Sequence, residues 1–280
     1  MDLLVVGGSG FLGLELTRQA RRAGHSVAAT FHSRVPDVAD VDWRSLDIRR
    51  RDDVMALAHA VRPDVIINAA YRQSDWATTA DGGMHVAVAA AAVGARLVHV
   101  SSDAVFSGTT ARYDEAHAPD PITPYGAAKA AAETAIKGIT PTAAIARTSL
   151  IIGNGDSPHE RHVHALATDA VTGVLFTDDM RCPVHVTDLA AALIELAASS
   201  YAGIHHVAGA DAISRYELGV LIARRDGLDP ATLSAGLRAG TGLPGPIDVR
   251  LDSANTQARL NTRLRGAREF LAATPSASRE

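Results

Sequence analysis

Residues 1–13 read MDLLVVGGSGFLG, in which a short apolar run leads directly into glycines at positions 7, 10 and 13. In a strand–turn–helix unit, the first glycine permits a tight turn, the second lets the backbone approach a pyrophosphate, and the third lets the helix pack closely on the sheet. The phosphates would lie at the helix N-terminus, where free amides and the helix dipole favour negative charge. This stretch predicts a dinucleotide-binding turn, with a plain strand–helix connection as the alternative.

Beyond this turn, short apolar runs alternate with helical stretches through residue 150. We expect strands at residues 3–6, 26–31, 64–68, 96–101 and 142–147, and helices at residues 12–23, 51–61, 76–93 and 125–137. Runs that are apolar on both faces and separated by helices are typical of a parallel sheet covered on both sides. The expected fold class is therefore α/β, with a doubly wound parallel Rossmann sheet.

The second half of the chain is less regular. We expect helices at 159–172 and 187–199, strands at 174–176, 184–186 and 204–207, and a further helix after Ser214, which has a capping-box spacing to Glu217. Residues 1–150, with the helix at 187–199, would form the NAD(P)-binding Rossmann domain. Residues 151–186 and 200–280 would form a smaller, interleaved C-terminal substrate-binding subdomain, with a frayed end at 274–280.

The composition excludes several classes of protein. With 47% hydrophobic residues among 280, the chain can bury enough surface to fold. A net charge of −4 provides no basic field for nucleic acid, and no run approaches the roughly 18 apolar residues of a membrane helix. Cys182 is the only cysteine and cannot close an intrachain disulfide, so we expect a reducing, cytoplasmic location.

The end of the second expected strand bears on the choice of cofactor. The sequence there is Phe31-His32-Ser33-Arg34, with no acid before Asp37. NAD enzymes place an acid near this point to bind the ribose 2′-hydroxyl, whereas an arginine accommodates the 2′-phosphate of NADP. The sequence therefore favours NADP(H) over NAD(H), unless these residues form only a solvated loop.

A tyrosine and a lysine begin the fourth expected helix. Tyr125 and Lys129 are four residues apart and share one helical face. An ammonium beside a phenol stabilises the phenolate, so we expect Lys129 to lower the pKa of Tyr125 toward usefulness as an acid–base group. Ser101 and Ser102 end the fourth expected strand, at the sheet edge where α/β proteins bind ligands. A hydroxyl there can hydrogen-bond the reacting oxygen of a substrate.

These motifs together resemble the extended short-chain dehydrogenase/reductases, and more closely their dTDP-4-dehydrorhamnose reductase branch. The resemblance covers nearly the whole chain. Besides the glycine turn, the segments that carry it are Asn68-Ala69-Ala70, Ser101-Ser102-Asp103-Ala104-Val105-Phe106-Ser107-Gly108, Pro124-Tyr125 with Lys129, Arg147-Thr148, and residues 181–190 and 203–209. It implies an NADP-dependent reductase of a keto sugar, with a nucleotide-linked 4-keto-6-deoxy sugar as the substrate.

The resemblance also implies roles for individual residues. The catalytic triad would be Ser102, Tyr125 and Lys129. The residues that would bind the cofactor are Gly7, Ser9, Gly10, Phe11, Leu12, Gly13, His32, Ser33, Arg34, Asp47, Ile48, Ala69, Ala70, Tyr71, Arg72, Tyr125 and Lys129. The residues that would bind the substrate are Ser102, Asp103, Val105, Phe106 and Arg181. A structural ion pair is the alternative role for Arg181.

Two other functions remain open at this point. One is a non-catalytic NADP-binding regulatory subunit, of the kind found with methionine adenosyltransferase, and the other is a sugar-nucleotide epimerase. Two residues depart from the branch: Ala104 replaces a usual tyrosine, and His85 a usual asparagine. Sugar-nucleotide 4,6-dehydratases carry a glutamate at the position of Ala104, so water elimination is not expected. The sequence leaves a homodimer open.

The remaining candidates have simpler interpretations. His159, His162 and His164 lack a common helical face and a neighbouring cysteine, so we expect no metal site. Cys182 is expected to be a small core residue. The run at residues 49–51, three arginines, is expected to form a solvated helix face.

Overall fold

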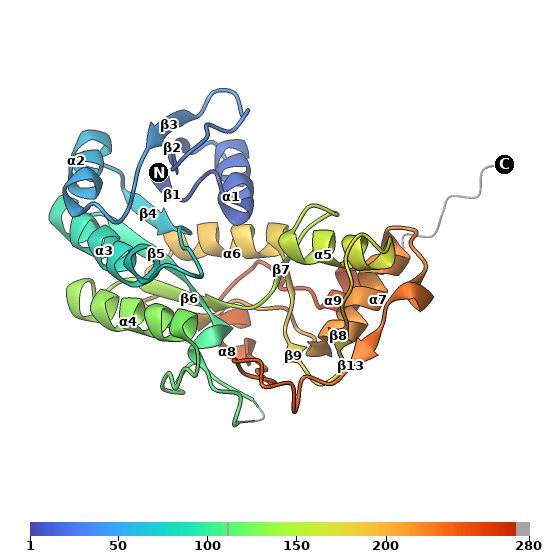
Figure 1. Ribbon diagram of the computed structural model, residues 1–280. Helices are drawn as coiled ribbons and strands as arrows, with labels where there is room; N and C mark the ends of the chain where they lie inside the picture. The colour runs from blue at the N-terminus through green and yellow to red at the C-terminus, as the bar shows by residue number, and fades with distance from the viewer. Residues whose placement is uncertain (111, 273–280) are drawn as a thin grey trace.

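The centre of the molecule is a seven-stranded parallel sheet. The computed structural model describes residues 1–110 and 112–272. Within them, the strand order is β11-β6-β5-β4-β1-β2-β3, and every pairing is parallel (Figure 1). The strands are β1 (Asp2–Val6), β2 (Ser26–Phe31), β3 (Asp42–Ser45), β4 (Val65–Asn68), β5 (Arg96–Ser102), β6 (Ala144–Thr148) and β11 (Gly203–His206). The expected α/β Rossmann fold is confirmed.

Helices cover both faces of this sheet because its central strands are apolar on both sides. Along β1, Leu3 and Val5 belong to one core cluster, while Leu4 and Val6 belong to another. The first cluster lies under α1 (Phe11–Arg22) and α6 (Val186–Ala198). The second lies under α2 (Arg51–Val61), α3 (Gly82–Val93) and α4 (Pro124–Ile139). The period-two alternation of strand side chains thus divides one strand between two cores.

The strand order reverses between β1 and β4, which lie side by side although β2 and β3 come between them in the chain. In doubly wound folds, ligands bind in the crevice outside the carboxyl ends of the strands at this switch point. Gly7 follows β1, and Ala69 and Ala70 follow β4. The fold therefore places the glycine turn at the expected ligand crevice.

A smaller unit, at the right of Figure 1, is built from short elements around its own apolar core. Its strand pairs are β7 (Ile151–Ile152) with β10 (Val184–His185), β8 (Leu175–Phe176) with β13 (Ala235–Gly236), and β9 (Met180–Arg181) with β12 (Ile213–Ser214). Its helical elements include α5 (Pro158–Ala167), α7 (Arg215–Arg225), η3 (Pro230–Thr232) and α9 (Ala267–Phe270), while α8 (Ala254–Gln257) packs against β11 of the large sheet. The Ser214 hydroxyl accepts a hydrogen bond from the amide of Glu217, as the sequence predicts.

Besides short elements that the sequence did not indicate, among them β7, β9, β12 and β13, four elements differ from the sequence-based expectation. β11 pairs with β6 in the large sheet, although residues 200–280 were expected to lie in the smaller subdomain. β3 was not expected, because an exposed edge strand lacks apolar alternation. The helix expected at 76–93 begins as a π-helical segment, η1 (Ala77–Asp81), and the one expected at 159–172 ends at Ala167. The expected frayed end at 274–280 lies outside the described residues.

None of the helices in residues 1–110 and 112–272 combines the length and the apolar character needed to cross a membrane.

Candidate active site

The turn between β1 and α1 is made of backbone that leaves no room for side chains. Gly7 has a φ of +82°, and a Cβ there would lie 2.7 Å from the amide nitrogen of Ala70. A Cβ at Gly13 would lie 2.1 Å from the Gly7 carbonyl oxygen. The N-cap of α1, Gly10, has no side chain to cap the helix, so its first amides are available to an anion. This cradle fits the diphosphate of a dinucleotide.

A cavity of about 280 Å³, the cofactor cleft, opens above this turn. Most of the expected cofactor residues line it: Gly7, Ser9, Gly10, His32, Ser33, Asp47, Ile48, Ala69, Ala70, Tyr71 and Arg72. Residues that sequence reasoning missed also line it: Thr30, Phe31, Leu46, Arg49 and Thr78. Thr78 reaches the cleft from η1, a segment whose π-helical turn the apolar pattern did not reveal.

The expected cofactor residues that do not line the cleft are Phe11, Leu12, Gly13, Arg34, Tyr125 and Lys129, and the first three lie behind it. Leu12 is buried in the core between the sheet and α6, and Phe11 packs against the same cluster. Gly13 abuts the Gly7 carbonyl, as described above. In the structure, the three residues behind the cleft support the turn by packing.

Asp47 lines the cleft and contacts two basic side chains, Arg49 and His32. The Arg49 guanidinium binds its carboxylate at 2.6 Å, and His32 Nε2 lies 3.8 Å away. The hydrogen bonds from Arg49 lower the pKa of Asp47 to about 2. Arg49 is exposed, as expected, and it also lines the cleft. Arg34 is exposed and, within the described chain, has no ion-pair partner and does not line the cleft.

The residues of the expected catalytic triad come from two elements. Ser102 ends β5, and Tyr125 and Lys129 lie in the first turns of α4. The helix begins at Thr123, whose hydroxyl accepts a hydrogen bond from the Gly126 amide at 3.0 Å. A Cβ at Gly126 would lie 2.0 Å from the Ala104 carbonyl oxygen. This close approach of α4 to the segment after β5 brings Tyr125 within hydrogen-bonding reach of Ser102.

The electrostatics of this group differ from the expectation that Lys129 lowers the pKa of Tyr125. Burial raises the pKa of Tyr125 well above its ordinary value, and the hydrogen bond with Ser102 only partly opposes this. Lys129 is itself buried, and burial lowers its pKa to about 8. Its Nζ donates to the Val100 carbonyl at 2.9 Å and lies 5.1 Å from the centre of the Tyr71 ring. Tyr125 is therefore a protonated phenol at neutral pH.

A buried ion pair fixes the elements behind this group. Glu133 of α4 binds Arg147 of β6 in a bidentate pair at 2.8 and 3.0 Å, and both side chains are 1% exposed. The same carboxylate accepts a hydrogen bond from Ser101 of β5 at 2.6 Å. Because charge-assisted contacts join β5, β6 and α4, the group formed by Ser102, Tyr125 and Lys129 stands on a rigid base. The sequence analysis did not single out Glu133.

The expected substrate residues do not all face a cavity. Val105 and Phe106 are fully buried, and Phe106 stacks on Tyr113 with ring centres 4.1 Å apart. Their side chains are core, because the short helix η2 (Asp103–Val105) turns them inward. Arg181 is buried and donates to the carbonyls of residues 180, 246 and 247. The structural ion pair, given as the alternative for Arg181, is what the structure contains.

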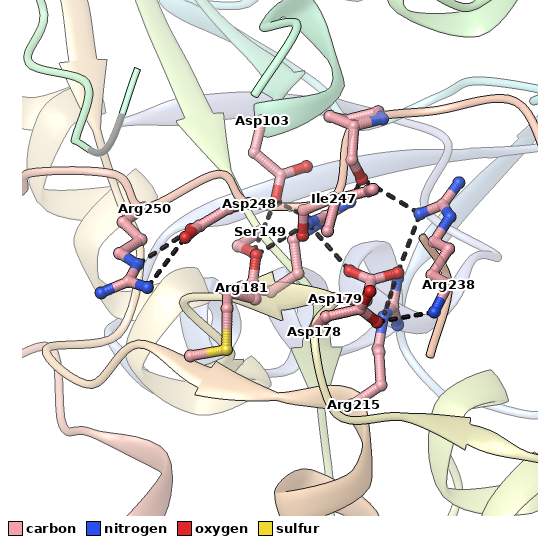
Figure 2. Close-up of polar contacts among 12 residues, drawn as sticks. Asp103, Ser149, Asp178, Asp179, Arg181, Arg215, Arg238, Ile247, Asp248 and Arg250 are labelled. Atoms are coloured by element: carbon pink, nitrogen blue, oxygen red, sulfur yellow. Dashed lines mark hydrogen bonds and ion pairs between the residues drawn. The ribbon is translucent and has the colours of Figure 1, made fainter. Parts of the chain in front are cut away.

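That ion pair belongs to a polar network around Asp103 and Asp179 (Figure 2), which Ser102 joins at the end of β5. Ser102 donates to one carboxylate oxygen of Asp103 at 3.3 Å, and Ser149 donates to the other at 2.6 Å. Arg181 lies 3.7 Å from Asp103 and 2.8 Å from Asp179. Buried polar contacts thus connect the end of β5 to the smaller unit.

A second cavity, of about 220 Å³, lies in the smaller unit. It is lined by His159, His162, Val163, Val174, Leu175, Phe176, Asp179, Arg215 and Leu218. Sequence reasoning weighed His159 and His162 only as metal ligands, and His164 instead pairs with Asp226 at 2.6 Å. Arg215 was missed, although its position directly after an N-cap serine places it at the start of a helix.

Two remaining residues take structural positions. His85 Nδ1 lies 2.9 Å from the Ile48 carbonyl oxygen, so it contacts the cofactor cleft from behind. Cys182 is buried in a core cluster with Phe106 and Val249, and burial raises the pKa of its thiol to about 11.

Comparison with known proteins identifies one family. The family model of the RmlD substrate binding domain matches residues 1–278. The spore coat polysaccharide biosynthesis protein SpsK of Bacillus subtilis is 32% identical over 243 residues, 83% of this chain and 82% of that protein. A dTDP-4-dehydrorhamnose reductase of Streptomyces griseus is 33% identical over 245 residues, 81% and 77% of the two chains. A dTDP-4-dehydrorhamnose reductase of Bacillus anthracis, solved with NADP, is similar with a TM-score of 0.83 and 25% identity over 97% and 96% of the chains.

Proposed function

The chain belongs to the family of the RmlD substrate binding domain, and from that premise we propose that it is an NADPH-dependent reductase of a nucleotide-linked 4-keto-6-deoxy sugar. The observation that carries the proposal is the meeting of Ser102, Tyr125 and Lys129 beside a cleft that fits a dinucleotide. The Rossmann unit would bind the cofactor and the smaller unit the substrate. The Streptomyces griseus and Bacillus anthracis relatives, named as dTDP-4-dehydrorhamnose reductases, support the choice of sugar.

The cofactor cleft would hold NADPH with its diphosphate on the glycine turn and its nicotinamide toward Tyr71 and Lys129. When bound, NADPH supplies a hydride for the carbonyl carbon of the substrate. Tyr125 holds the proton that the carbonyl oxygen receives, and its raised pKa keeps that proton in place until charge develops on the oxygen. The Ser102 hydroxyl orients the same oxygen.

Lys129 would act on the bound cofactor rather than on the phenol of Tyr125. With a pKa of about 8, it carries its positive charge at neutral pH. Through this ammonium, Lys129 would donate a hydrogen bond to the nicotinamide ribose of the bound cofactor. The hydrogen bond to the Val100 carbonyl keeps the ammonium in position for this role.

The test is NADPH consumption with a panel of 4-keto-6-deoxy sugar nucleotides. We expect turnover with the wild type, and a fall in kcat of about 10²–10⁴-fold in Tyr125→Phe with unchanged NADPH affinity. Tyr201→Phe, at the start of the segment leading into β11, is the matched control and should retain full activity. Equal activity in both variants would remove the role of Tyr125.

The same assay separates the two alternatives. A wild type that binds NADPH but consumes it with none of these sugars, and that copurifies with a partner enzyme, would be a regulatory subunit. Interconversion of two sugar nucleotides without net consumption of the nucleotide cofactor would identify an epimerase.

A further inference from the structure

The ammonium of Lys129 is a buried charge with few polar partners. Lys129 is 2% exposed, and one of the three donors of its ammonium is bound, by the Val100 carbonyl at 2.9 Å. In the described part of the chain, no carboxylate forms an ion pair with it, and the carboxylate of Glu133 is already bound by Arg147 and Ser101. Buried charges are costly unless they are paired, so a further stabilising contact is needed.

The ring of Tyr71 provides such a contact. The Lys129 ammonium nitrogen lies 5.1 Å from the centre of this ring. A cation within about 6 Å of an aromatic centre is attracted by the negative charge of the ring face, and more strongly where water is excluded. Tyr71 is 56% exposed and lines the cofactor cleft. Its ring therefore contacts both the buried ammonium and the space that the cofactor would fill.

The backbone is held on both sides of Tyr71. On one side, Asn68 at the end of β4 accepts a hydrogen bond from the Ala70 amide at 3.1 Å. On the other, the Thr79 hydroxyl of η1 binds both the amide and the carbonyl of Arg72, at 3.1 and 2.8 Å. Two side chains thus fix the main chain around an aromatic residue whose own side chain is exposed. The position of the ring is set by the fold before any ligand binds.

The contacts of Tyr71 are made by its ring and not by its hydroxyl. Within residues 1–110 and 112–272, this hydroxyl forms no hydrogen bond, whereas the ring contacts Lys129 and also Tyr125, with ring centres 5.9 Å apart and planes inclined by 46°. A role in proton transfer would need the hydroxyl to be joined to the group that it serves. The contacts in the structure instead favour a role for the ring face.

We propose that Tyr71 is a positioning residue, whose ring holds the Lys129 ammonium where it donates to the ribose of the bound cofactor. The Val100 carbonyl holds the ammonium from the sheet, and the ring holds it from the side of the cleft. This inference rests on the proposed function for the role of Lys129. Its experimental test requires cofactor binding only, with no substrate and no turnover.

The test is fluorescence titration of the intact protein with NADPH in a double-mutant cycle of Tyr71→Leu and Lys129→Met. Tyr71→Leu keeps an apolar side chain but removes the ring face, and we expect NADPH affinity to fall about three- to tenfold. Lys129→Met should weaken NADPH about tenfold, because the charged donor to the ribose is lost. When Lys129→Met is already present, Tyr71→Leu should change the affinity by less than about twofold, since no ammonium remains for the ring to hold.

Two further variants separate the ring from other features of the segment. Tyr71→Phe keeps the ring face and should bind NADPH as the wild type does. Trp76→Leu is the matched control, because Trp76 is an exposed aromatic residue of the same segment that does not line the cleft. It should also retain the wild-type affinity. Thermal unfolding of each variant shows that it is folded at the temperature of the titration.

The outcomes decide the assignment as follows. Losses that add in the double variant would show that Tyr71 contacts the cofactor directly, and would overturn the inference. An equal loss in Tyr71→Phe would assign the role to the hydroxyl, and an equal loss in Trp76→Leu would assign the effect to the segment as a whole. Wild-type affinity in Tyr71→Leu, or in Lys129→Met, would also overturn it.

The inference and the proposed function fail separately. If the cycle shows that Tyr71 acts through Lys129 while no keto sugar consumes NADPH, the positioning role stands and the reductase proposal falls. If NADPH is consumed while the effects of the two variants add, the reductase proposal stands and the role of Tyr71 falls.

Discussion

The two cavities are built in different ways. The cofactor cleft rests on a contiguous turn at the end of β1, where backbone atoms approach too closely for any side chain. The second cavity is assembled from residues 159–163, 174–179 and 215–218, and its shape depends on charged side chains that hold one another. The difference teaches that one site is encoded by local conformation and the other by long-range pairing.

The largest effect should come from the pairing that holds the second cavity. Arg181→Met removes the nearest cation of Asp103 and one of the two arginines that bind Asp179 closely, and we expect the free energy of unfolding to fall by about 3–5 kcal/mol. Arg250→Met, which breaks the exposed pair with Asp248, should cost about 1 kcal/mol or less. Denaturant unfolding measures both. Similar losses would show that the second cavity does not depend on its charges.

One buried charge near the cofactor cleft, the Lys129 ammonium, should destabilise the folded state. Burial lowers the pKa of Lys129 from 10.5 to about 8. Below pH 8 the lysine is charged in both states, and burying that charge makes the folded state less stable relative to the unfolded state. Between pH 8 and 10.5 the unfolded state binds more protons, and the contribution of Lys129 to stability rises with pH. Lys129→Met should therefore raise the unfolding free energy by about 1–3 kcal/mol at pH 7, and less at pH 10. Urea unfolding at both pH values is the measurement; a gain independent of pH would contradict it.

The backbone design of the cofactor cleft can be tested with two glycines of the same conformation. Gly7 and Gly24 have φ values of +82° and +81°, but a Cβ at Gly24 meets nothing within 4 Å. Both alanine variants should carry the left-handed strain of about 1–2 kcal/mol. Gly7→Ala should lower the free energy of unfolding by a further ~1–3 kcal/mol, because its Cβ overpacks against Ala70. It should also weaken NADPH binding. Thermal unfolding measures the stability of both variants, and titration with NADPH measures their cofactor affinity. If Gly7→Ala and Gly24→Ala behave alike, the close approach of the backbone at Gly7 is not required.

The smallest effect concerns side chains at the rim of the cofactor cleft. Arg34→Ala should weaken NADPH about tenfold and leave NADH unchanged, because the charge-assisted contact to the 2′-phosphate is lost. Arg49→Ala should weaken both cofactors by a few-fold, since Arg49 holds Asp47 in place. Fluorescence titration with each cofactor checks this. If Arg49→Ala alone discriminates NADPH from NADH, the phosphate contact belongs to Arg49.

What could be predicted from the sequence follows the same division. The glycine turn, all five strands expected before residue 150 and the Tyr125–Lys129 pair lie within a residue or two of their predicted places, because each depends on local spacing. The role of Asp179 with its arginines was not visible, since its partners come from residues 181, 215 and 238. The direction of the Tyr125 pKa shift was wrong for a related reason: burial is a property of the folded chain.

The missed strand β3 and the strand β11, which was assigned to the wrong unit, have a physical explanation too. β3 is polar and exposed, and it pairs only at the edge of the sheet, so apolar alternation does not mark it. β11 joins the opposite edge through backbone hydrogen bonds to β6, which any sequence can form. Edge strands are less constrained in composition than central ones, so the sequence pattern missed β3, and the strand expected at 204–207 carried no sign of the sheet that it joins.

The position of β11 has a consequence for synthesis on the ribosome. About 60 residues separate the end of β6 from the end of β11, and most of them fold into the smaller unit. At roughly 5–20 residues per second, the nascent chain spends about 3–12 s with the edge of β6 unpaired and the face beneath α6 uncovered. An open parallel edge beside an apolar face is a template for association with other chains. The interval in which this protein is most vulnerable to aggregation therefore falls before residue 206 has emerged, when its cofactor turn has already been made.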